Sequence, residues 1–173
     1  GIEVFDLVPL LDNLSRQGTP PFLRGDSHWS PSGMSEVARF VAEKTSVQAP
    51  GEPYQTVERS LSSIGNLTRL MGRTKKESLS SSMVLGQNDE VWKPRPGAPF
   101  LLLGDSFSRI YSQEDMGWGK GAGLAETLSL EMSAPVDRIA FNKNGAFASR
   151  EALLHHPERL ANKSVVVWQF AMR

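Results

Sequence analysis

The sequence contains no cysteine, and this absence removes several kinds of chemistry at once. Disulfide bonds, metal–thiolate sites and a cysteine nucleophile are all excluded. The formal net charge is zero, so the composition gives no sign of a surface that binds nucleic acid. The longest apolar runs, FLLL and VVVW, are too short to cross a bilayer. The first residues do not resemble a signal peptide, which says little about export because the chain does not begin with methionine.

What is present fits one folded domain. The chain has 173 residues, and 39% of them are apolar, which is enough for a core. Helical and strand patterns alternate along it. Strands are expected at 2–5, 100–103, 137–142 and 164–170, and helices at 6–18, 30–46, 121–132 and 149–156. This alternation predicts an α/β fold whose mostly parallel sheet is covered on both faces.

The ends of several helices carry capping signals. Asp6 can cap the first helix, Ser30 with Pro31 marks the start of the second, and Ser149 can cap the last.

The segment 46–98 reads differently from the rest. It predicts a loop at 46–60, a short helix within 63–72, a polar irregular stretch at 73–82, and a hairpin or two short edge strands at 82–94. We interpret it as an irregular insertion or lid within a single domain of residues 1–173, because it has too few apolar residues for a core of its own.

A serine at the end of a strand is the first candidate for chemistry. The apolar run at 100–103 leads into Gly104, Asp105 and Ser106, so Ser106 is expected at the carboxyl edge of the sheet, where open α/β sheets bind ligands. Glycine lets the backbone turn sharply there. If a helix begins at this point, its first N–H groups can form part of an oxyanion hole. The alternative is that Asp105 or Ser106 only caps that helix.

Asp26 and His28 are the second candidate. In an extended segment, side chains two residues apart point the same way, so the carboxylate can hold one imidazole nitrogen while the other faces a serine hydroxyl. The alternative is that Asp26 caps a turn and His28 is a partly buried polar residue beside Trp29. Because triads assemble in space and in any chain order, Ser106 supplies the partner that favours the first reading.

Two other motifs could also have a function, the tripeptide at 24–26 and the histidine pair at 155–156. Arg24-Gly25-Asp26 is a tripeptide that adhesion receptors bind, although such matches are common by chance. If Asp26 serves His28, it should lie against the imidazole and not at a loop tip. His155 and His156 follow a helical pattern, and their simpler role is to interact with the helix C-terminus.

These motifs together resemble a family. RGDSHWSPSG is similar to the Asp-x-His-Trp segment of alginate O-acetyltransferases of the AlgJ/AlgX type, LLLGDSFS to their nucleophile block, and VVVWQFAMR to their closing strand. The specific point is the permuted order, in which Asp and His precede Ser. The resemblance runs from EVFDL to the end and is weak through 50–98. It implies an SGNH-hydrolase-like three-layer sandwich. Family members have a further strand and helix before EVFDL, so either the sheet lacks an N-terminal strand or the chain is truncated.

Carried over to this chain, the resemblance implies roles for three residues. Ser106 is the expected nucleophile, His28 the general base and Asp26 its orienting carboxylate. Weaker candidates for the wall of the site and for oxyanion or substrate contacts are Trp29, Tyr111, Asn142 and Asn144. Asn144 with Gly145 reads equally well as an ordinary turn. Arg109 is either a contact for an anionic sugar or a solvated surface arginine.

The expected function is O-acetyl transfer to a bacterial extracytoplasmic, alginate-like polysaccharide through an acetyl-serine. Two alternatives stay open, a carbohydrate acetylesterase of the same chemistry and a non-catalytic polysaccharide-binding scaffold. The resemblance implies a polysaccharide acceptor, an acetyl donor supplied by a membrane acyltransferase partner, and no bound cofactor or metal. It also implies a periplasmic or otherwise extracytoplasmic location, with membrane association only through a segment outside this chain.

Overall fold

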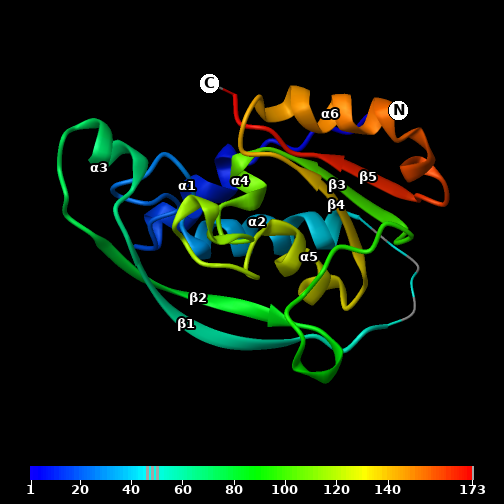
Figure 1. Ribbon diagram of the computed structural model, residues 1–173, viewed down its shortest axis with the longest axis horizontal. Coiled ribbons are helices and arrows are strands. Elements are labelled where there is room, and N and C mark those ends of the chain that lie inside the picture. The colour runs from blue at the N-terminus through cyan, green and yellow to red at the C-terminus, as the bar shows by residue number, and fades with distance from the viewer. Residues whose placement is uncertain (46, 48, 50, 173) are drawn as a thin grey trace.

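The computed structural model describes residues 1–45, 47, 49 and 51–172 as a mixed α/β molecule (Figure 1). Within these residues, three parallel strands form a sheet in the order β4-β3-β5, and β1 pairs with β2 in a separate antiparallel hairpin. The strands are β1 (Gln55–Ser63), β2 (Glu77–Leu85), β3 (Phe100–Gly104), β4 (Val136–Ala140) and β5 (Val165–Trp168). The α-helices are α1 (Val8–Arg16), α2 (Pro31–Lys44), α3 (Asn66–Leu70), α4 (Ser106–Arg109), α5 (Leu124–Met132) and α6 (Gly145–His155). Short 3-10 helices cover Gln87–Asp89, Glu114–Met116 and Pro157–Leu160.

Helices cover both faces of the parallel sheet. Phe100 and Leu102 of β3 belong to the main core, which α2 and α5 close from one side. Leu101 and Leu103 point the other way and pack with Ile139 of β4 against partly buried side chains of α6. A strand buried on both faces has to be apolar at every position, which is why this run is continuous and does not alternate. The α/β fold and the parallel sheet predicted from the sequence are confirmed.

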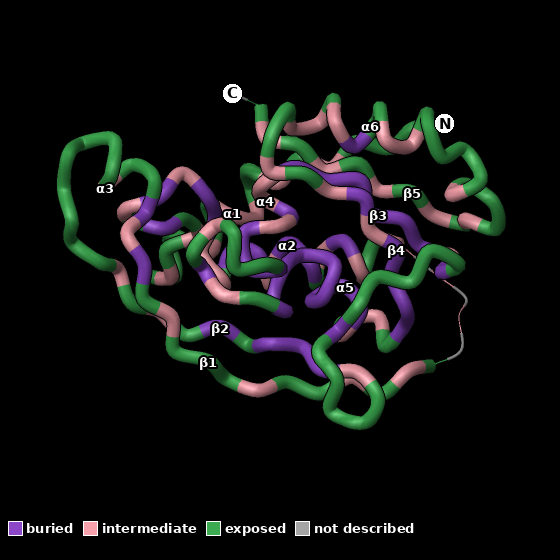
Figure 2. Tube along the Cα trace, in the orientation of Figure 1, coloured by how far each residue is buried: buried purple, intermediate pink, exposed green. Residues whose placement is uncertain are grey.

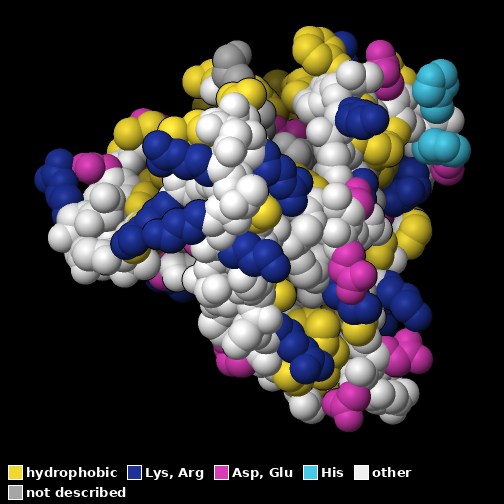
Figure 3. All heavy atoms as spheres, turned by 60° about the vertical axis from the view of Figure 1, so that its left-hand side comes forward, with side chains coloured by type: hydrophobic (Ala, Val, Ile, Leu, Met, Phe, Trp, Pro, Cys, Tyr) yellow, Lys and Arg dark blue, Asp and Glu magenta, His cyan; other side chains and the backbone are white. Residues whose placement is uncertain are grey.

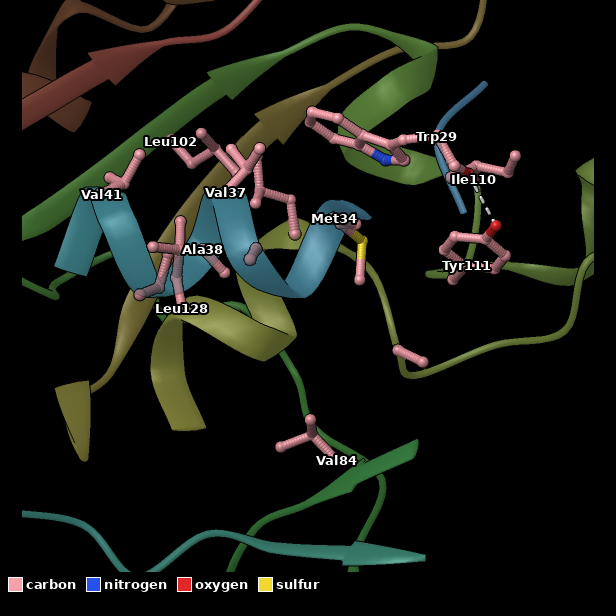
Figure 4. Packing of buried hydrophobic residues seen from close by; sticks show 14 of the residues in the cluster. Trp29, Met34, Val37, Ala38, Val41, Val84, Leu102, Ile110, Tyr111 and Leu128 are labelled. Atoms are coloured by element: carbon pink, nitrogen blue, oxygen red, sulfur yellow. Dashed lines mark hydrogen bonds between the residues drawn. The ribbon is translucent and has the colours of Figure 1, made fainter. Parts of the chain in front are cut away.

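Helix α2 is fixed by signals at its own start. The Ser30 hydroxyl accepts the Gly33 N–H at 3.1 Å, and Pro31 occupies the first helical position, as predicted. The helix buries Met34, Val37, Ala38 and Val41, which Figure 4 shows gathered near Leu102 and Leu128. Burying the side chains of Met34, Val37 and Val41 contributes about 1.5–3 kcal/mol each. The helix therefore anchors the loop that precedes it, and that loop carries Asp26 and His28.

The hairpin corrects the prediction of irregular structure at 55–60 and 77–82, whereas 51–54 and 73–76 are irregular as predicted. Its nine-residue strands pair from Gln55 opposite Leu85 to Ser63 opposite Glu77. Figure 2 shows buried residues along β2, whereas β1 is mostly exposed. Polar residues on the inner face broke the two-residue apolar period that normally reveals a strand, since Arg59 lies opposite Ser81 between the apolar pairs of Val57 and Leu61. Residues 46, 48 and 50 lie outside the described residues, and the reading of 46–98 as an insertion or lid stays a prediction.

The remaining predictions for this segment hold in part. The expected short helix is α3. The stretch 82–94 supplies the end of β2, but Val91 forms only a single bridge to Leu85 and no second strand.

Three local predictions near the other elements are wrong. The segment 2–5 has no strand partner among the described residues, and Ile2 is 96% exposed. Asp6 accepts the Val8 N–H at 3.0 Å, but the N-cap position of α1 belongs to Leu7. Ser149 lies buried inside α6, which begins four residues earlier than expected, and its hydroxyl donates to a carbonyl of the same helix.

None of the helices in the described part of the chain is both long and apolar enough to cross a membrane.

Candidate active site

Ser106 lies where β3 turns into α4. Asp105 is the N-cap of α4, and its Oδ1 accepts the Phe107 N–H at 2.8 Å. Its Oδ2 accepts the Ala171 N–H at 2.7 Å, which ties the turn to the segment after β5. The capping role considered for Asp105 is therefore real, and it places Ser106 as the first residue of the helix.

A glycine is required just before this turn. A Cβ on Gly104 would lie 2.3 Å from Ser108 Oγ and 2.5 Å from Ser108 Cβ. Only glycine lets the strand end pack this closely on the helix that follows.

The loop before α2 folds back on itself and presents Asp26 and His28 together. The Leu23 N–H donates to the His28 carbonyl at 3.0 Å, and Phe22 forms an antiparallel bridge with Trp29. Asp26 Oδ1 lies 2.6 Å from His28 Nδ1 and 3.3 Å from the His28 backbone nitrogen. Two residues of separation are thus enough to bring carboxylate and imidazole into contact.

The imidazole also reaches the serine. His28 Nε2 lies 2.8 Å from Ser106 Oγ, so a continuous chain of hydrogen bonds runs from Asp26 through His28 to Ser106. Asp26 and His28 are buried, at 6% and 4% exposure, whereas Ser106 is only partly covered. Because an ionised carboxylate only accepts hydrogen bonds, Asp26 favours the tautomer with hydrogen on Nδ1, which leaves Nε2 to accept from the hydroxyl.

The electrostatics keep Asp26 charged. Burial alone raises the pKa of Asp26, but hydrogen bonds from His28, the Asn66 N–H and the Trp118 indole outweigh it and lower that pKa to about 2. Oδ2 accepts the Asn66 N–H at 2.9 Å and the Trp118 Nε1–H at 3.1 Å. Hydrogen bonds to the charged form favour ionisation, so the carboxylate is ready to stabilise an imidazolium.

Aromatic rings pack around the imidazole. The Phe107 ring lies 4.7 Å from the His28 ring, and the Trp29 ring meets Phe107 edge to face at 5.3 Å. Phe107 therefore contacts both the imidazole and the Trp29 ring, and Trp29 is 3% exposed. In the described part of the chain its Nε1 has no hydrogen-bond partner.

The other predicted residues are not brought into the hydrogen-bonded chain. Tyr111 is fully buried, and its hydroxyl donates to the Trp29 carbonyl at 2.8 Å (Figure 4). Burial and the nearby Asp26 charge raise the pKa of Tyr111, which keeps it a neutral donor. Asn142 donates to Asp115 at 2.7 Å, and Asn144 adopts the left-handed conformation at the start of α6, as in the turn reading.

Arg109 is not a freely solvated arginine. It donates to Gln113, to Asp115 at 3.2 Å and to the Ala140 carbonyl at 3.4 Å. Its guanidinium thus holds the end of β4 against α4.

Sequence reasoning missed two donors to Asp26. Asn66 acts through its backbone N–H, which leaves no trace in residue identity. Trp118 did leave a signal, because it lies between Gly117 and Gly119, whose φ angles of +79° and +83° allow a tight loop that turns the indole inward.

A hollow of about 540 Å³ lies beside the loop that carries Asp26 and His28. It is lined by Arg24 and Gly25, which directly precede Asp26, and by residues of the β1–β2 connection and of the start of β2. A second hollow, of about 600 Å³, lies between α2 and the hairpin, and neither hollow is lined by Asp26, His28 or Ser106. We take the first as relevant to the site because two of its lining residues, Arg24 and Gly25, directly precede Asp26.

The fold and the Asp26–His28–Ser106 geometry define a class, an SGNH-hydrolase-like α/β domain with a permuted order of site residues. The family model for the SGNH hydrolase-like domain of the acetyltransferase AlgX matches residues 1–172. The chain belongs to this family of acetyltransferase domains.

Two solved structures are similar in fold. The O-acetyltransferase domain of Pseudomonas putida AlgJ has a TM-score of 0.72 and 21% identity, and the match covers 95% of this chain and 58% of that chain. Pseudomonas aeruginosa AlgX has a TM-score of 0.66 and 18% identity, with 96% of this chain and 43% of that chain covered. This chain therefore spans less than two thirds of each. No curated protein sequence matched.

Proposed function

We propose that this domain transfers acetyl groups to hydroxyls of an extracytoplasmic bacterial polysaccharide, with Ser106 as nucleophile, His28 as general base and Asp26 as orienting carboxylate. The observation that carries the proposal is the unbroken contact from Asp26 Oδ1 to His28 Nδ1 at 2.6 Å and from His28 Nε2 to Ser106 Oγ at 2.8 Å. Membership of the AlgX acetyltransferase family supports acetyl as the group transferred.

The chemistry follows the order of these contacts. His28 Nε2 takes the proton of Ser106 Oγ as the oxygen attacks the acetyl carbonyl carbon of the donor. The resulting imidazolium, stabilised by Asp26, gives that proton to the leaving group, and acetyl-serine remains. In the second half of the reaction, His28 takes the proton of a sugar hydroxyl while the oxygen of that hydroxyl attacks the acetyl carbon. Breaking the bond to Ser106 Oγ returns the proton to the serine and releases acetylated sugar.

The hollow beside Asp26 supports an anionic acceptor. Four of its lining residues are cationic, and no ion pair involves any of them in the part of the chain that the structure describes: Arg24, Arg73, Lys75 and Lys76. Figure 3 brings the α3 side forward and shows Lys and Arg side chains gathered on this face. Unpaired cations next to a catalytic loop fit a carboxylate-bearing sugar chain such as an alginate-like polymer.

The donor and the location are part of the same proposal. The acetyl donor that we propose is one delivered by a membrane acyltransferase, as the sequence resemblance implies. Membership of the AlgX acetyltransferase family supports a periplasmic or otherwise extracytoplasmic setting. Neither a metal nor a bound cofactor takes part in the steps above.

The first test is hydrolysis of a chromogenic acetyl ester. Ser106→Ala is expected to abolish turnover, and Ser15→Ala, which removes an exposed hydroxyl on α1, is expected to leave it unchanged. A folded wild-type protein that neither turns over the ester nor is labelled at Ser106 by a fluorophosphonate would favour the non-catalytic scaffold instead.

A second test separates transferase from esterase. Oligouronates and neutral oligosaccharides are added with the ester, and the products are examined by mass spectrometry. Acetylated oligouronate supports the proposal, whereas acetate alone under every condition supports the esterase.

The acceptor is tested with a charge-matched pair of variants. Lys75→Gln with Lys76→Gln is expected to raise KM for the oligouronate about fivefold, since each exposed charge contributes only a fraction of a kcal/mol to about 1 kcal/mol. KM for the small ester should not change. Lys44→Gln with Lys93→Gln removes the same charge away from the hollow and should change neither value.

A further inference from the structure

The carboxylate of Asp26 divides its two oxygens between different partners. Oδ1 lies against His28, and Oδ2 accepts the Asn66 N–H at 2.9 Å and the Trp118 Nε1–H at 3.1 Å. Asn66 begins α3 in the connection between β1 and β2, and Trp118 follows the 3-10 helix after α4. Both donors come from outside the loop that carries Asp26.

The backbone of that loop is held from the same side. The carboxylate of Glu77, the first residue of β2, accepts the Arg24 N–H at 3.1 Å and the Gly25 N–H at 2.9 Å. The Gly25 carbonyl accepts the Thr68 N–H at 3.0 Å. Thr68 of α3 and Glu77 of β2 thus hold the backbone of the two residues just before Asp26.

A comparison of the three buried indoles indicates that the hydrogen bond from Trp118 to Asp26 does more than satisfy the indole N–H. Trp92 Nε1 donates to the Ser129 hydroxyl at 2.8 Å, a neutral partner far from the site in sequence. Trp29 Nε1 is buried with no partner among the described residues. Trp118 instead donates to an ionised carboxylate, and such bonds are about twice as strong as neutral ones.

We infer that Trp118 and Glu77 are positioning residues of the acetyl-transfer reaction, which hold the Asp26 carboxylate at the angle that keeps His28 directed at Ser106. This inference rests on the function proposed above. Trp118 fixes the rotation of the carboxylate through Oδ2, and Glu77 fixes the backbone from which Asp26 projects. The β1–β2 connection is then a support of the catalytic machinery.

The first experiment replaces Trp118 with phenylalanine, which deletes the N–H and keeps an aromatic ring. We expect kcat for the chromogenic ester to fall about tenfold, the scale of one hydrogen bond to a charged group. KM should stay unchanged, because Trp118 is only 1% exposed and its indole N–H is directed at Asp26. The acid limb of the pH profile should move to higher pH, since a carboxylate with fewer donors attracts the imidazole proton more strongly. Trp92→Phe deletes a matched indole bond and should leave kcat per active site and the profile as in wild type.

The second experiment tests Glu77 within the hairpin. In Glu77→Gln, one acceptor oxygen becomes an NH₂ group that faces a backbone N–H, and we expect kcat to fall about fivefold with KM unchanged. The matched control is Glu58→Gln, because Glu58 also uses its carboxylate inside the hairpin, where it accepts from Ser80 and Ser82. Glu58→Gln should keep wild-type kcat.

Active-site titration with a fluorophosphonate counts competent molecules and separates positioning from folding. If Trp118→Phe lowers turnover only in proportion to the titrated fraction, or keeps the wild-type pH profile, the inference is overturned. If wild type hydrolyses no ester, the proposed function fails, yet positioning is still tested by the downfield proton resonance of His28 Nδ1–H. That resonance should shift in Trp118→Phe and not in Trp92→Phe. An unchanged resonance in Trp118→Phe would refute the inference that Trp118 positions the Asp26 carboxylate.

Discussion

Replacing Asp26 with asparagine tests the orienting carboxylate with little change in shape. In the native site Oδ1 accepts from His28 and Oδ2 accepts from Asn66 and Trp118. An amide has one oxygen and one NH₂ group. If the oxygen stays on His28, the NH₂ group faces two N–H donors and no acceptor. The amide is therefore expected to direct its oxygen to Asn66 and Trp118 and its NH₂ group to the imidazole.

The free-energy difference between the two orientations of the amide follows from the N–H donors that each orientation leaves unpaired. A buried donor left unpaired costs about 1–3 kcal/mol. Turning the amide pairs the Asn66 and Trp118 donors but leaves the His28 backbone N–H, 3.3 Å from Oδ1, without its acceptor, so the turned amide is favoured by the cost of one unpaired donor. The NH₂ group then needs an acceptor at Nδ1, which moves the ring hydrogen to Nε2, 2.8 Å from Ser106 Oγ. This tautomer cannot take the hydroxyl proton. The same exchange in a serine-protease triad lowers kcat about 10⁴-fold, and we expect a loss of that order.

The assay is ester hydrolysis across neutral pH, combined with ¹⁵N spectra of the histidine rings to identify the tautomer of His28. Asp12→Asn, which changes an exposed carboxylate paired with Arg16 on α1, serves as the charge control and should behave as wild type. A folded Asp26→Asn protein within about tenfold of wild-type kcat, or one that keeps hydrogen on Nδ1, would contradict the reasoning about the donors.

Two further predictions concern the loop and its charge. In Gly65→Ala, the new Cβ would lie 2.0 Å from the Gly25 carbonyl oxygen and 2.8 Å from Asp26 Cβ. Thermal melts should show that the free energy of unfolding falls by about 1–3 kcal/mol, and kcat should also be lower. In Gly97→Ala the new Cβ meets nothing within 4 Å, so neither stability nor kcat should change. The pKa of Asp26 lies at about 2, below its usual 3.8, so its ionised form stabilises the fold. That contribution, about 2 kcal/mol, is complete above about pH 4 and is lost as pH falls through about 2. Urea unfolding from neutral to acid pH should show wild type losing this much more stability than Asp26→Asn, and equal losses would contradict it.

Local signals made the core and the start of α2 predictable. The run at β3 is apolar at every position because helices cover both of its faces, so composition alone revealed it. Ser30 and Pro31 specify a helix start through their own chemistry, and the structure confirms them. Each of these signals depends on residues within one turn or one strand of each other.

The hairpin could not be predicted in this way because its partners are distant and its inner face is interrupted by polar residues, with Arg59 opposite Ser81. Leu61 faces Leu79 across the two strands, and Glu58 accepts from serines of β2 some twenty residues away in sequence. Similarly, the spacing of Asp26 and His28 predicted their contact, but no pattern predicted which groups hold the second carboxylate oxygen. One of those groups is a backbone N–H that any residue except proline supplies.

The tripeptide Arg24-Gly25-Asp26 shows how one stretch of sequence serves a different purpose from the one its letters suggest. An adhesion receptor needs the aspartate in solvent, yet Asp26 is 6% exposed and its Oδ2 accepts two N–H donors. Gly25 has no room for a side chain, because a Cβ would lie 2.4 Å from Thr68 Oγ1, and the arginine lines the cationic hollow. Turning the carboxylate outward would strip Asp26 of the donors that keep its pKa low and would release His28. Receptor binding and orientation of the imidazole therefore exclude each other in this fold, and the geometry favours the imidazole.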